Sequence, residues 1–262
     1  MNRASSLSSL SSLARPSKLV GAALGGALAP AAFLGSLIRG GPVLHPSGVV
    51  YRADVEPLAV DGPFGELARR FTGVALLRLS GALRSWPQSG RRPDMLGIAL
   101  RLRGNDRTTT RRLVGDQDLL FVTSRSLLEL LVAVWATDVR DFLSNRYYTM
   151  LPYTMIGVGR VALRLIPEAP SPPGDDRRER LQAAVDRGEA TLRLEVRALP
   201  EGAWTPVAAV HLVQPLKVEP GELAFDPGTA AMGLTPVGVI QGARPPVYRA
   251  SEAGLRLALL LH

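Results

Sequence analysis

Beyond residue 40 the chain is a series of short segments in which hydrophobic and polar positions alternate. Alternation is clearest over residues 191–199, where Leu192, Leu194 and Val196 fall on one side and charged residues fall between them. A period of two places successive side chains on opposite faces, so this segment predicts a strand with one buried face. Similar patterns predict strands at residues 48–55, 73–80, 96–102, 118–123, 158–166 and 206–213, with 215–225 continuing or bending the ladder.

Three further segments have patterns typical of helices. Residues 126–142 carry apolar side chains at helical spacing, and Ser126 with Glu129 forms a capping box. Residues 175–186 predict a charged surface helix, and residues 247–261 predict a helix at the C-terminus. About eight antiparallel strands with few helices indicate an α+β fold that is mainly β, either a barrel or a sandwich.

The first forty residues differ from the rest. Residues 4–13 are a Ser/Leu tract, and residues 19–38 contain no charge and have Pro30 in their middle. This apolar run fits a helix of a cytosolic protein, a membrane anchor or an export signal. We expect an N-terminal segment over residues 1–40 and one domain over residues 41–262. We place the protein in the cytoplasm, with membrane association or export as alternatives.

Composition narrows the chemistry. Hydrophobic residues make up 46% of the chain, which is typical of a globular protein. The net charge is +8, but the arginines are scattered and aromatics are only 5%, so we expect no nucleic-acid partner. The absence of Cys excludes disulfides, iron–sulfur clusters and thiolate-bound haem, and three His make a multi-His metal site unlikely to form.

Arg244 and Tyr248 are the pair that suggests chemistry. Four residues apart, they share one face of the predicted C-terminal helix. A guanidinium close to the phenol oxygen favours the phenolate, and iron would complete the deprotonation. An Arg one turn before a Tyr therefore fits a tyrosinate ligand of haem iron. The same spacing also occurs in solvent-exposed pairs on helices that have no role in binding.

The segment around this pair, LAFDPGTAAMGLTPVGVIQGARPPVYRAS at residues 223–251, resembles the haem-ligand region of the haem catalase superfamily. There an F-(D/N)-P stretch leads through a Gly/Pro loop to (L/I)-Q-G-R-x-x-x-Y; here Ala243 is one extra residue. The similarity is closer still to short catalase-like proteins, which end in P-(L/V)-G-x-I-x-x-A-R-x-x-V-Y-x-A-S. The resemblance implies one haem b whose iron is bound by Tyr248, with Arg244 and Arg256 beside the cofactor.

Further matches follow in the family's order. His45 lies in VLHPSG, Arg78 and Ser80 lie in LRLS, and the stretches PDMLGIALR (93–101), DLL (118–120) and 144–153 also resemble it. The resemblance implies that His45 moves a proton on the distal side of the haem, that Ser80 hydrogen-bonds it and that Arg78 binds a haem propionate. It also implies an antiparallel eight-stranded catalase-like β-barrel with flanking helices.

One departure concerns the distal side. Typical catalases continue D-L with V-G-N-N, whereas this chain has LFVT over residues 120–123. Thr123 therefore joins His45 and Ser80 as a catalytic candidate in place of the family's amide. Without that amide, bulkier and more apolar peroxides are favoured over hydrogen peroxide, since buried CH₂ groups contribute about 0.8 kcal/mol each.

These observations predict a haem peroxidase or hydroperoxidase that acts on hydrogen peroxide or on organic or lipid hydroperoxides, with hydroperoxide dehydration as a related reaction. Two alternatives remain: a non-catalytic haem carrier or sensor on the same barrel, and a haem-free lipid-binding barrel in which Tyr248 only packs. Expected partners are haem, the peroxide, a membrane surface contacted through residues 19–38, and further copies of the chain.

Overall fold

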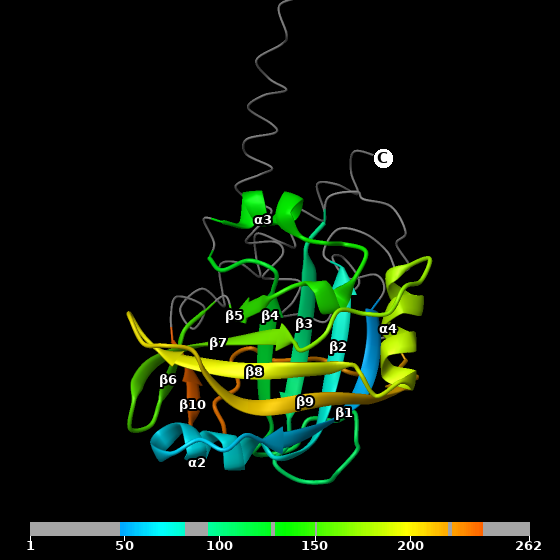
Figure 1. Cartoon of the computed structure of the whole chain (residues 1–262). Coiled ribbons are helices and arrows are strands. Elements are labelled where there is room, and N and C mark those ends of the chain that lie inside the picture. The colour runs from blue at the N-terminus through cyan, green and yellow to red at the C-terminus, as the bar shows by residue number, and fades with distance from the viewer. Residues whose placement is uncertain (1–47, 82–93, 127–128, 150, 220–221, 238–262) are drawn as a thin grey trace, which may run out of the picture.

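The computed structural model describes residues 48–81, 94–126, 129–149, 151–219 and 222–237 (Figure 1). Its strands form one sheet in the order β10-β6-β7-β5-β4-β3-β2-β1-β9-β8. Because β7 also pairs with β8, the eight strands from β7 through β8 close into an antiparallel barrel. The predicted mainly β fold with an eight-stranded barrel is therefore confirmed, and the sandwich is excluded.

The strands match the alternating segments of the sequence closely. They are β1 (Gly48–Pro57), β2 (Gly73–Gly81), β3 (Leu96–Leu102), β4 (Gln117–Val122), β5 (Tyr147–Thr149), β6 (Tyr153–Met155), β7 (Gly159–Pro167), β8 (Thr191–Ala198), β9 (Thr205–Leu216) and β10 (Leu234–Pro236). The short strands β6 and β10 extend the sheet beyond β7. Of the predicted segment 215–225, the first two residues belong to β9, and the described residues 217–219 and 222–225 lie outside the sheet.

Apolar side chains fill the inside of the barrel. Alternate residues of each long strand point inward and are fully buried, for example Leu77 on β2, Phe121 on β4 and Leu194 on β8. Helix α2 (Gly62–Phe71) adds Phe71 and its neighbours to the same core and packs against β1 and β9. The barrel interior is therefore occupied by side chains.

The helices lie at the ends of the barrel (Figure 1). Helix α3 (Leu130–Ala136) follows β4, and α4 (Arg177–Asp186) begins at Asp176, whose carboxylate accepts hydrogen bonds from the first turn of the helix. The prediction of one long helix over residues 126–142 is wrong in extent. The helix ends at Ala136 because the backbone of Thr137 turns to an extended conformation (φ −74°, ψ 128°), and a separate 3-10 turn (Phe142–Ser144) follows.

Candidate functional site

The outer face of β1–β4 carries the strand residues that resemble the haem catalases. The strand register places Gly48, Ser80, Gly97 and Val122 side by side across the four strands. The next row is formed by Val50, Arg78, Ala99 and Leu120. Arg78 and Ser80 are therefore brought together on one face, with the motif glycine and alanine of β3 directly beside them.

The side chains near the centre of this face are small. A Cβ on Gly48 would lie 2.9 Å from Arg78 Nε and 2.8 Å from Leu79 O, so only glycine lets these strands and the guanidinium approach so closely. Gly97 and Ala99 continue the low strip on β3. The larger side chains of Leu120 and Val122 border it on β4. Arg78 and Ser80 of β2 stand between Gly48 and the small residues of β3, and Leu223 and Phe225 pack on Ala99. A ligand on this face would therefore contact these side chains.

Arg78 is partly buried on this face. Burial lowers the pKa of its guanidinium from the ordinary value, because charge is less well solvated there than in water. Arginine remains charged in proteins, so a buried guanidinium strengthens any contact with an anion at this face. The neighbouring Ser80 side chain is buried as well. Together they place a guanidinium and a hydroxyl beside the small residues Gly48, Gly97 and Ala99.

Thr123 takes a different place from Arg78 and Ser80. Its hydroxyl accepts the Leu96 backbone N–H at 3.2 Å and lies 2.7 Å from the Thr137 hydroxyl. These contacts tie the start of β3 to the end of α3. The residue that stands in the row with Ser80 is Val122, which packs with Met95 and Ala133 of α3. The β4 side of the face is therefore apolar.

A buried ion pair anchors the stretch that begins the C-terminal motif. Arg101 donates two hydrogen bonds to the Asp118 carboxylate, at 2.7 and 2.9 Å, and both side chains are fully buried. Asp118 also accepts the Asp226 backbone N–H at 2.8 Å, and the Arg101 guanidinium lies 5.1 Å from the centre of the Phe225 ring. Residues 225 and 226 of the F-D-P motif are thus fixed on the outer face that carries Arg78.

Leu223 and Phe225 also pack against the outer side of the barrel. They form one cluster with outward-facing Val50, Leu76 and Ala99. Arg101 and Asp118 occur in the sequence motifs PDMLGIALR and DLL, but the sequence alone predicted no role for either. Their signal was an Arg and an Asp at outward positions of neighbouring predicted strands. Only the register shows that they face each other.

The remaining predicted site residues, His45, Arg244, Tyr248 and Arg256, lie outside the described residues, as does the apolar segment 19–38. His45 precedes β1 by three positions in the sequence, and β1 begins with Gly48 in the row of Ser80. No group of three or more metal-binding side chains (His, Cys, Asp or Glu) occurs among the described residues. Within the same residues no helix has the length and hydrophobicity needed to span a membrane.

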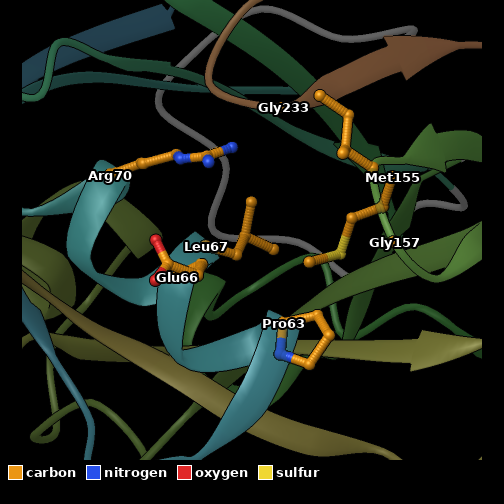
Figure 2. A pocket seen from close by; sticks show the side chains of 8 residues that line it. Pro63, Glu66, Leu67, Arg70, Met155, Gly157 and Gly233 are labelled. Carbon is orange, nitrogen blue, oxygen red and sulfur yellow. The ribbon is translucent and has the colours of Figure 1, made fainter.

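A separate cavity of about 250 Å³ lies between α2 and the turns beside β6 and β10 (Figure 2). Pro63, Leu67 and Arg70 line it from α2, and Met155 and Gly233 line it from the opposite side. It is smaller than the ~300 Å³ at which pockets for drug-sized ligands begin. The Arg70 guanidinium also donates to Met232 O at 3.5 Å, so it helps to hold the chain before β10. None of the predicted site residues contributes to this cavity.

Comparison with known proteins gives no relative. No model of a protein family matches the chain, and no curated protein matches it. The outer face of β1–β4 must therefore be judged by its own geometry.

Proposed function

We propose that the outer face of β1–β4 forms the distal wall of a haem site and that the chain is a haem-dependent peroxidase of the catalase-like class. One observation carries this proposal. Four separate stretches that resemble the haem catalases, around residues 48, 78–80, 97–101 and 118–120, meet with the F-D-P motif on one face of the barrel. A shared site requires these stretches to lie on one face, and the register of the four consecutive strands meets that requirement.

The shape and charge of the face fit a haem. A porphyrin is flat, and three residues that flank Arg78 and Ser80 on the neighbouring strands, Gly48, Gly97 and Ala99, have no side chain larger than a methyl group. A haem also carries two propionates, and a guanidinium can bind a carboxylate through two parallel hydrogen bonds. Arg78, in the row next to Gly48, supplies that group in partly buried surroundings. We propose Arg256 for the second propionate, from the family resemblance.

The other tyrosines support Tyr248 as the iron ligand. The chain has five tyrosines, and three of them, Tyr51, Tyr147 and Tyr153, lie in the barrel core. Burial raises the pKa of all three phenols, so each strongly prefers the neutral form, which is a poor iron ligand. Tyr148 and Tyr248 remain, and only Tyr248 has an arginine, Arg244, four residues before it.

Each candidate residue would have a separate role in a peroxidase reaction. When bound, haem supplies a redox-active iron for cleavage of the peroxide O–O bond. Tyr248 would hold it as the phenolate, which the positive charge of Arg244 stabilises. His45 would take the proton from one peroxide oxygen and deliver it to the departing oxygen. Ser80 would orient the His45 imidazole through a hydrogen bond, as its counterpart does in the resembling family.

The apolar border favours a particular substrate class. Val122 and Thr123 stand where V-G-N-N of typical catalases carries its two amides; Val122 is fully buried, and Leu120 borders the face in the next row. This side of the face offers hydrophobic contact and no hydrogen bond from a strand side chain. Alkyl and lipid hydroperoxides gain about 0.8 kcal/mol for each CH₂ group buried in such a site, whereas hydrogen peroxide gains nothing. We therefore propose organic hydroperoxides as the preferred substrates.

Haem reconstitution of the full-length chain tests the proposal. The parent should bind one haem and show a Soret band without a thiolate signature. Y248F should lose or loosen the haem, whereas the matched Y148F variant should keep it. H45A should keep the haem and lose peroxide turnover. Loss of haem in Y148F instead of Y248F, or full turnover in H45A, would overturn the assigned roles; a parent that binds haem without any turnover would make the chain a carrier.

A further inference from the structure

We propose that the side of the barrel formed by α3, β5, β7 and the β8–β9 hairpin docks onto an anionic lipid surface. This face, called here the docking face, has an apolar part at Val132 and Trp135 and a basic aromatic part around Trp204. It consists of described residues only, so it is distinct from residues 19–38. It also does not depend on haem binding.

The apolar part lies on α3. This helix contains no charged residue, and Val132 and Trp135, three residues apart, lie on the same side of it. Their exposed fractions are 68% and 78%. On the opposite side Ala133 is buried against Val122 and Met95, which fixes the helix to the barrel. An exposed Trp beside an exposed Val is typical of surfaces that enter the lipid interface.

The basic part alternates guanidinium groups with aromatic rings. The guanidinium carbons of Arg164 and Arg197 lie 4.3 and 4.8 Å from the centre of the Trp204 ring. Trp204 packs edge-on against Tyr148 with 6.3 Å between ring centres, and Arg125 lies over Tyr148 at 5.7 Å. The rings hold the guanidinium groups in place. Arg164 donates to Glu195, whereas the exposed Arg125 has no carboxylate partner among the described residues and can donate to phosphate oxygens.

The charge of this part is positive overall, although the turn between β8 and β9 adds one exposed acid, Glu201. Strands β7 and β8 carry four arginines and a single acid, Glu195. Glu195 is buried and is held between Arg164 and Arg193, so it takes up little of the total charge. Among the described residues, no carboxylate forms an ion pair with Arg125, Arg160 or Arg197. Each basic group close to an anionic membrane adds favourable binding energy.

The two parts are continuous. Val122, on which α3 rests, is paired with Tyr148, and Tyr148 is paired with Arg164. Neighbouring strands are about 4.8 Å apart, so the apolar helix and the basic strip adjoin. Figure 1 shows α3 at the end of the barrel, with β5 and β7 below it. An apolar insertion beside a basic aromatic strip fits a lipid surface better than a nucleic acid, which offers nothing to bury Val132 and Trp135.

Vesicle sedimentation with the full-length chain tests this proposal. Vesicles are made of phosphatidylcholine alone or of phosphatidylcholine mixed with phosphatidylglycerol. We expect binding to the anionic vesicles that weakens with salt, and little binding to the neutral ones. W135S removes the apolar anchor, and R125E/R160E reverses two exposed charges; each should weaken binding by about tenfold or more.

Matched control variants lie elsewhere on the barrel. V114S removes an apolar side chain that is 107% exposed in the turn between β3 and β4, at the opposite end of β4 from α3. R107E/R187E reverses two exposed charges outside the docking face. V114S should bind like the parent, and R107E/R187E should lose far less than R125E/R160E. Absence of binding to anionic vesicles, equal losses in controls and docking-face variants, or tight binding of a single-stranded oligonucleotide that W135S leaves intact would overturn the proposal.

Discussion

Arg101 and Asp118 face each other across β3 and β4 and form a bidentate ion pair that is completely buried on the outer side of the barrel. The same two side chains hold the returning chain, because Arg101 donates to Ala224 O and Asp118 accepts from Asp226 N. The pair thus joins the barrel wall to the segment that leads toward the C-terminus.

This arrangement predicts that removing one partner of the ion pair destabilises the fold more than the double-mutant cycle would give for independent residues. D118N should reduce the free energy of unfolding by about 3–5 kcal/mol, because it leaves the Arg101 charge buried with a neutral partner. The double variant R101L/D118L should cost less than the sum of the two single variants, since no uncompensated charge remains. Urea unfolding of the parent, R101L, D118L and the double variant measures the cycle, with D118N as a separate comparison. Additive single effects would show that the two side chains are not coupled.

A second prediction concerns Arg78. R78L should weaken haem binding by about ten- to a hundredfold, because a charge-assisted hydrogen bond contributes about 1.5–3 kcal/mol. The matched variant is R52L, on the same outer face of β1, where Arg52 already pairs with Asp54 at 2.7 Å. A haem titration followed by absorbance compares them. Equal affinities of R78L and the parent would remove Arg78 from the site.

The buried phenols predict alkaline sensitivity. Burial raises the pKa of Tyr51 to about 12, whereas an exposed Tyr titrates near 10. A group whose pKa is higher in the folded state stabilises the fold fully below the unfolded-state value and loses this contribution as pH rises through the folded-state value. The melting temperature should therefore fall as pH increases from about 10 to 12.

Y51F provides the control for this pH effect. The variant lacks the ionising oxygen and gives up only one hydrogen bond, at 3.3 Å to Gln182. Its melting temperature should decline less steeply over the same pH range, while Tyr147 and Tyr153 keep part of the effect. Identical slopes for parent and variant would show that Tyr51 ionises in the folded protein as it does in water.

Strands were easier to predict than helices in this chain, for physical reasons. Half-buried strands leave a period-two signal, and β3 agrees with its predicted range at both ends. Helix α2 was missed, although Pro63 in its first turn and buried Leu67 and Phe71, four residues apart, are the signals for it. Its glycines and its position between two strands are equally typical of a loop.

The short strands and the site depended on contacts that no local pattern contains. Strands β5, β6 and β10 have three residues each, too few to show alternation. Arg78 and Ser80 were predicted to share a face from their spacing, and the register confirms it. The role of Gly48 depends on how closely β2 approaches, and Thr123 could not be separated from Val122 without knowing where β4 ends.

The clustering of arginines likewise follows from strand register. In the sequence Arg125, Arg164 and Arg197 are far apart and look scattered. The closed barrel brings them to one side, where Trp204 and Tyr148 lie between them. A scattered distribution along the chain is therefore no guide to the distribution on the surface of a β-barrel.

The most direct test of a haem site on the outer face of β1–β4 is a haem titration of two Ala→Trp variants. Ala99 lies in the low strip beside Arg78, and Ala162 lies on the outer face of β7, on another side of the same barrel. With circular dichroism as the check on folding, A162W should bind haem like the parent. A99W should not, because the indole would take the space beside Arg78 in which Ala99 now packs against Leu223 and Phe225. A folded A99W that binds haem with parental affinity and spectrum would contradict the account.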